Sequence, residues 1–128
     1  MAEQAFSNFD VDALDGIAKR HGFKRKGPRN WHRRTTDFLQ LVNLQRSQWS
    51  RDVVYLNFAM WPLALGEPPT LSESKFHFRT RAESMGAFDL ASFFAVVDEL
   101  NTLDDLREAE ESGRISCLIT KDLRALFD

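Results

Sequence analysis

Three segments of the chain alternate polar with apolar residues, a pattern that gathers the polar side chains on one face of a β-sheet. Arginine donates two parallel hydrogen bonds to a carboxylate or phosphate, amides fix the orientation of a ligand, and tyrosine offers a flat surface. We therefore predict a polar and cationic sheet face that binds an anion or a planar ligand. Its candidate residues are Asn43, Gln45, Ser47, Tyr55, Asn57, His77, Arg79 and Arg81. The alternative is an ordinary solvated face, since antiparallel sheets commonly turn one polar face to water.

A second group of candidates forms a basic strip in the first third of the chain. Residues 19–34 include eight Lys or Arg and no acid. Cations interleaved with an aromatic residue are typical of proteins that bind single-stranded nucleic acid. The net charge of −2 and the lack of an RNP, KH or C2H2 pattern argue against that function. The residues of the strip are Lys24, Arg25, Lys26, Arg29, Trp31, Arg33 and Arg34.

The segment Asp98 to Glu111 has the opposite charge, with seven acids and one arginine. An acidic helical face could cover a basic protein partner, as a small cytosolic protein of the immunity type covers a toxin. The alternatives are two solvated faces of opposite charge, or two halves of one domain that attract each other.

No motif in the sequence predicts an enzyme, a metal site or a cofactor. Neither a glycine-rich phosphate loop nor a C-x-x-C, H-E-x-x-H or G-x-S-x-G pattern occurs. The histidines His21, His32 and His77 lie in separate predicted elements and lack metal-ligand spacing. Cys117 lies in an apolar run, which is typical of a core thiol rather than a nucleophile. We expect a protein without metal or cofactor, and a binding function rather than catalysis.

The elements that must hold these side chains begin with a helix. Ser7-x-x-Asp10 reads as a capping box, Gly22 follows the last basic turn, and the helix is predicted over residues 8–21. Four strands are then predicted, and a loop of about ten residues with three prolines precedes the last of them. The strands are predicted over residues 31–35, 38–49, 53–61 and 74–81.

The last third of the chain has helical periodicity. An apolar stripe runs from Leu90 to Leu100, and Thr102-x-x-Asp105 is a capping box that starts a second helix. We predict a short final helix over Lys121 to Phe127. The secondary structure of the apolar run from Ile115 to Ile119 stays open.

Strands followed by helices predict an α+β fold in a single domain over residues 1–128. We expect an N-terminal helix, an antiparallel sheet of about four strands, and C-terminal helices packed on one sheet face. That buried face should carry Val54, Leu56, Phe58, Met60, Phe76 and Phe78. Which face of strand 38–49 is buried stays open, because its two sets of alternate residues have opposite trends, and a bulge or twist could switch faces midway.

The compartment follows from simple counts. One cysteine precludes an internal disulfide and fits a reducing environment. The first residues do not resemble a signal peptide, and no run of apolar residues is long enough to span a membrane. We expect a cytoplasmic protein that does not contact a membrane.

The order of several short motifs resembles a known family. These are the residues from His21 to Arg34 (HGFKRKGPRNWHRR), Leu41 to Ser47 (LVNLQRS), Tyr55 to Phe58 (YLNF) and Arg79 to Arg81 (RTR). The set resembles the bacterial family called domain of unknown function 4304, over about residues 8–81. The resemblance implies a bacterial, soluble, single-domain protein and carries no assigned activity. It also singles out Gln45, Ser47, Asn57, Arg79 and Arg81.

Together these patterns predict a non-enzymatic binding module. Its polar sheet face, or the basic strip beside it, would bind a small anion or an acidic protein. The alternative is an interaction protein that uses the acidic segment 98–111 for a basic partner. The third possibility is nucleic-acid binding through the basic strip.

Overall fold

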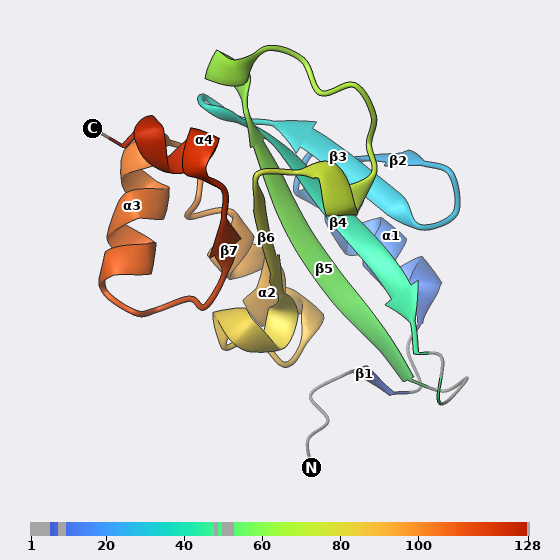
Figure 1. Cartoon of the computed structure of the whole chain (residues 1–128). Helices are drawn as coiled ribbons and strands as arrows, with labels where there is room; N and C mark the ends of the chain where they lie inside the picture. The colour runs from blue at the N-terminus through green and yellow to red at the C-terminus, as the bar shows by residue number, and fades with distance from the viewer. Residues whose placement is uncertain (1–5, 8–9, 48, 50–52, 128) are drawn as a thin grey trace.

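The computed structural model describes residues 6–7, 10–47, 49 and 53–127 of the 128-residue chain. It confirms the predicted α+β fold, with an N-terminal helix, an antiparallel sheet and C-terminal helices (Figure 1). The predicted first helix includes Asn8 and Phe9, and the predicted middle strand includes Gln48. These three residues lie outside the described residues.

The sheet has more strands than the four predicted. Six strands lie side by side in the order β2-β3-β4-β5-β6-β7, each antiparallel to its neighbours, and β1 pairs with the start of β5. The additional strands are only two or three residues long, too short to show an alternation of their own. The strands are β1 (Phe6–Ser7), β2 (Lys24–Lys26), β3 (Asn30–Arg34), β4 (Phe38–Arg46), β5 (Val53–Pro62), β6 (Phe78–Arg81) and β7 (Leu118–Ile119).

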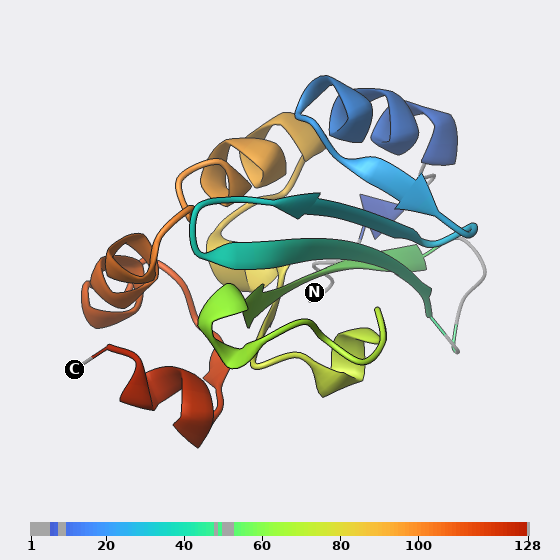
Figure 2. The same ribbon diagram turned by 90° about the horizontal axis from the view of Figure 1, so that it is seen from above.

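The helices and the loops cover opposite faces of this sheet. Helices α1 (Val11–Arg20) and α2 (Leu90–Val97) lie on one face, and the loop of residues 63–77 crosses the other (Figure 2). Helices α3 (Leu103–Glu111) and α4 (Lys121–Ala125) lie beside the β7 side of the sheet (Figure 1). Three 3-10 turns complete the described structure, at Leu63–Leu65, Glu73–Lys75 and Ala82–Met85.

Side-chain caps fix where the helices begin. Asp10 is the N-cap of α1, because its carboxylate accepts a hydrogen bond from the backbone N–H of Asp12 at 2.9 Å. The predicted capping box that starts at Ser7 is therefore wrong, and Ser7 lies in β1 instead. The predicted box of Thr102 and Asp105 is present at the start of α3.

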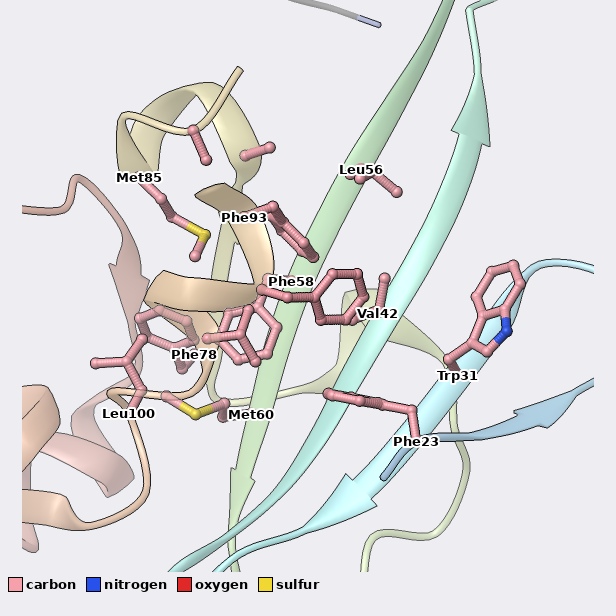
Figure 3. Packing of buried hydrophobic residues seen from close by; sticks show 14 of the residues in the cluster. Phe23, Trp31, Val42, Leu56, Phe58, Met60, Phe78, Met85, Phe93 and Leu100 are labelled. Carbon is pink, nitrogen blue, oxygen red and sulfur yellow. The ribbon is translucent and has the colours of Figure 1, made fainter. Parts of the chain in front are cut away.

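The main core lies between the sheet and helices α1 and α2. Phe58, Phe78 and Phe93 are fully buried there, and the Phe58 ring meets the other two edge to face with centroids 5.8 and 6.2 Å apart (Figure 3). Leu56 and Met60 face the same core, as predicted from the alternation along β5.

A smaller apolar cluster occupies half of the opposite face. It contains Leu39, Leu41, Ala59 and Phe76, and residues of the crossing loop pack against it. Phe76 was predicted on the helix-covered face beside Phe78, and that prediction is wrong. The strand β6 begins only at Phe78, and a 3-10 turn precedes it, so the alternation does not extend back to Phe76.

This second cluster shows which faces of the middle strand, β4, are buried. The pairing of β4 with β5 is continuous from Phe38–Pro62 to Arg46–Val54, so neither a bulge nor a change of face occurs. The first half of β4 is buried on both faces because helices cover one and the loop covers the other. The second half of the loop-side face stays polar, and the candidate residues gather there.

Candidate functional site

One row of directly opposed residues crosses five strands on the loop side of the sheet. The pairings along this row are Lys26 with Asn30, Asn30 with Asn43, Asn43 with Asn57, and Asn57 with Arg81. Neighbouring strands lie about 4.8 Å apart, so a side chain in the row can reach the next one. We call these five residues the polar row.

Hydrogen bonds join four members of the polar row. The Asn43 amide nitrogen donates to the Asn30 side-chain oxygen at 2.9 Å, and the Asn57 amide nitrogen donates to the Asn43 oxygen at 2.9 Å. The Arg81 Nε donates to the Asn57 oxygen at 3.1 Å. Asn57 is only 4% exposed, so these partners replace the water that its amide loses.

Arg81 is held in place at the end of this row. Its Nη2 lies 3.4 Å from the Gln45 side-chain oxygen, which also accepts a hydrogen bond from Asn57 at 2.9 Å. The guanidinium carbon lies 4.2 Å from the centroid of the Tyr55 ring, within the range of a cation–π contact. Three side chains thus orient a guanidinium that keeps further N–H donors for a ligand, because arginine carries five.

An open cavity of about 450 Å³ lies beside this guanidinium. We call it the Arg81 cavity. Arg79 enters it from the same strand, and its Nη1 donates to the backbone oxygen of Ser74 at 3.2 Å. Ser84 and Ser116 also line the cavity, and the backbone N–H of Ser116 donates to the backbone oxygen of Ser84 at 3.0 Å. A cavity lined by two arginines and two serines is suited to a carboxylate or a phosphate.

The structure gathers most of the predicted face but not all of it. Asn43, Gln45, Tyr55, Asn57 and Arg81 form one connected group, and Arg79 joins Arg81 at the cavity. Ser47 lies just beyond the end of β4 and lines a neighbouring hollow. His77 lies apart, at the other end of the same face. Its Nδ1 is 2.7 Å from the Thr120 hydroxyl, and its ring centroid is 4.5 Å from that of Trp61.

Sequence reasoning did not identify Asn30, Ser84 or Ser116 as site residues. Asn30 lies just before the predicted strand of residues 31–35, and its role depends on the register between β3 and β4. The two serines lie 32 positions apart in the sequence and meet only because β7 pairs with β6. No local pattern marks either of them.

The family model described as Domain of unknown function (DUF4304) matches residues 14–128. The chain belongs to this family. The resemblance seen in residues 8–81 is therefore confirmed, and membership of DUF4304 extends through the C-terminal helices. Neither a curated protein nor a solved structure matches the chain.

The basic strip of this DUF4304 chain is dispersed rather than presented as one surface. Trp31 is fully buried, and its indole N–H donates to the Asp15 carboxylate at 2.8 Å. That hydrogen bond holds the pKa of Asp15 below its usual value. The prediction that Trp31 contacts a ligand is therefore wrong, because β3 alternates and turns this residue toward the core.

Several cations of the strip have partners within the fold. Arg33 is mostly buried and donates to Asp98 at 2.9 Å, while Arg34 pairs with Glu67 of the crossing loop. Arg25 donates to the backbone oxygen of Pro28 at 2.9 Å. The remaining members, Lys24, Lys26 and Arg29, are exposed. The strip therefore presents fewer available cations than its sequence indicates.

Many carboxylates of the acidic segment are paired as well. Arg114 bridges Glu99 and Glu108 at 3.1 and 3.3 Å, and Arg124 contacts Glu110 at 2.8 Å. Asp98 accepts from Arg33 of the basic strip and lies 2.7 Å from His21. The two charged blocks of this DUF4304 chain therefore meet each other, which reduces the charge left for a basic partner.

No group of three or more His, Cys, Asp or Glu residues is placed to hold a metal ion among the described residues. Within the same residues, no helix is both long and apolar enough to cross a membrane.

The single thiol of the chain, that of Cys117, is expected to be unreactive. Cys117 lines the cavity, and burial together with nearby Glu110 raises its pKa to about 11. The thiolate is the reactive form, so alkylation by iodoacetamide at pH 7.5 should be far slower than that of a free cysteine of pKa about 8.5. The alkylation rate, followed by mass spectrometry, should keep rising up to pH 10. A plateau below pH 9 would contradict this assignment.

Proposed function

We propose that this DUF4304 protein is a non-enzymatic binding module that holds an anionic group in the Arg81 cavity. The orientation of Arg81 by Asn57, Gln45 and Tyr55 is the observation that carries the proposal. A guanidinium that is already fixed loses little conformational freedom when it binds a ligand, so its donors are preorganised for a carboxylate or phosphate. Arg79 adds a second positive charge at the same cavity.

The anionic group would belong to a small molecule or to an acidic segment of a partner protein. The cavity is open, which supports either source, and Glu73, which also lines it, would select against a ligand with negative charge on that side. The chemistry of the walls supports binding rather than turnover, because the Cys117 thiol stays protonated at neutral pH. As part of the same proposal, a single cysteine supports a reducing compartment such as the cytoplasm.

Thermal unfolding in the presence of simple anions tests this proposal. Phosphate, sulfate, acetate and citrate are each added at millimolar concentration, and at least one should raise the unfolding temperature of the wild-type protein. A hydrogen bond to a charged group contributes about 1.5–3 kcal/mol, so Arg81→Gln should weaken binding roughly tenfold or more. Arg79→Gln is the second variant, because Arg79 takes no part in the polar row and should leave the fold intact.

The matched control is Arg29→Gln, which removes an exposed arginine from the turn between β2 and β3. The control should respond to the anions as the wild-type protein does. Equal responses of all three variants would place any anion elsewhere on the surface and overturn the proposal. Native mass spectrometry of gently purified protein then separates the two sources, since an excess mass of small-molecule size differs from a second protein chain.

A further inference from the structure

A second open hollow, of about 360 Å³, adjoins the Arg81 cavity. We call it the Trp49 cavity, and it is lined by Gln45, Arg46, Ser47, Trp49, Tyr55 and Arg81. Gln45 and Arg81 line both cavities. These two side chains therefore form a common wall, and a ligand that contacts Arg81 from one side has the other cavity within reach.

The walls of the Trp49 cavity are aromatic and cationic. The Trp49 side chain is 85% exposed, and its backbone N–H donates to the Ser47 hydroxyl at 3.0 Å. Tyr55 also lines the cavity, and the Arg81 guanidinium lies over its ring. A single exposed aromatic residue is common on protein surfaces, but this one borders a cavity that a second aromatic ring, Tyr55, and the Arg81 side chain also line.

Both kinds of wall suit a flat ring. Indole rings stack on planar ligands and on nucleic-acid bases, and guanidinium groups stack on aromatic faces as well. Arg81 provides such a group in the Trp49 cavity. The Arg81 cavity, by contrast, is lined mainly by polar side chains, and Arg79 and Arg81 among them suit an anion.

We propose that the two cavities form one site for a planar aromatic ring that carries an acidic group, as a mononucleotide or an aromatic carboxylate does. This inference rests on the proposed function, because the acidic group occupies the Arg81 cavity. The ring lies against Trp49 in the Trp49 cavity. Gln45 and Arg81 lie between this ring subsite and the acid subsite in the Arg81 cavity. The volumes of both cavities fall within the range of small-molecule pockets, about 300–1,000 Å³.

Isothermal titration calorimetry with fragments of one ligand separates the two subsites. The probes are adenosine 5′-monophosphate, adenosine and inorganic phosphate, with phenylacetate and acetate as the carboxylate pair. In at least one series the compound with both ring and acid should bind roughly tenfold more tightly than the acid alone, because stacking contributes about 1–3 kcal/mol per base. The series that does so identifies whether the acid is a phosphate or a carboxylate.

Variants of Trp49 assign the ring subsite. Trp49→Ala should weaken binding of the ring-bearing acid about tenfold and leave binding of phosphate or acetate unchanged. Trp49→Phe should restore most of the affinity, because it keeps an aromatic face. Phe88→Ala is the matched control, since Phe88 is another exposed aromatic residue, 63% exposed, that lines neither cavity. Because both side chains are exposed, neither substitution should impair folding.

The outcomes distinguish this inference from the proposed function. If phosphate or acetate binds through Arg81 and no ring-bearing acid binds more tightly, the anion site stands and the ring subsite is overturned. The ring subsite is also overturned if Trp49→Ala leaves the affinity for the ring-bearing acid unchanged. If none of the five probes binds the wild-type protein, the ring subsite is overturned, and the anion site is overturned as well when sulfate and citrate also fail to stabilise the protein.

Discussion

Replacing Arg33 with methionine is expected to lower the free energy of unfolding by about 2–4 kcal/mol, because it leaves polar partners of a buried guanidinium without donors. Arg33 Nε donates to the Gln40 side-chain oxygen at 2.9 Å, and Nη1 donates to the backbone oxygen of His21 at 2.7 Å. Gln40 is fully buried and itself donates to the backbone oxygen of Leu100 at 2.8 Å. One side chain thus ties the ends of α1 and α2 to the sheet.

Chemical denaturation by urea measures this effect. Lys24→Met is the matched control, because it removes an exposed cation from the adjacent strand β2 and should change the stability by no more than about 0.5 kcal/mol. Arg33→Lys should recover only part of the loss, since a single ammonium group cannot reach Gln40, His21 and Asp98 together. A loss below 1 kcal/mol for the methionine variant would show that water replaces these contacts.

Trp31→Ala is expected to lower the free energy of unfolding by about 3–5 kcal/mol, the range for removing a large aromatic residue from a core. The Trp31 side chain is fully buried, and Arg25 lies over its ring at 5.0 Å. Trp49→Ala, which removes an indole that is 85% exposed, is the matched control and should change the stability by no more than about 0.5 kcal/mol.

Trp31→Ala also separates two interpretations of the basic strip, in which Trp31 belongs either to a binding surface or to the core. If Trp31 contributed to a binding surface, its loss would weaken binding and spare the fold. Because Trp31 is buried, we instead expect its loss to destabilise the fold, with no direct effect on a binding surface. Trp31→Phe adds a finer measurement, because it keeps most of the apolar area and removes the hydrogen bond to Asp15. The pKa of Asp15 should then rise toward its usual value, which an NMR titration can follow.

Periodicity in the sequence was enough to predict the fold class and the polar face. The alternation along β5 assigned Leu56, Phe58 and Met60 to the core and Tyr55 and Asn57 to the other face. Alternation works there because a strand places successive side chains on opposite faces. It failed at Phe76, where a 3-10 turn interrupts the pattern, and it was not applied to β3, where it would have put Trp31 and Arg33 on one buried face.

The Arg81 cavity could be predicted only in part, for a different reason. The sequence indicates which residues share a face, but the register between strands decides which of them meet. The pairing of Asn57 with both Asn43 and Arg81 depends on that register. Ser84 and Ser116 reach the cavity through the pairing of β7, a strand of two residues with no periodic signal.

The hydrogen bonds of the polar row all run in one direction. Arg81 donates to Asn57, Asn57 donates to Asn43, and Asn43 donates to Asn30. An arginine side chain has no acceptor, so Arg81 sets this direction and none of the three amides can turn over alone. The row is therefore a polarised chain in which each bond strengthens the next. A ligand that draws on the donors of Arg81 would alter the polarisation of an amide three strands away, on β3, and that distant amide would report whether the cavity is occupied.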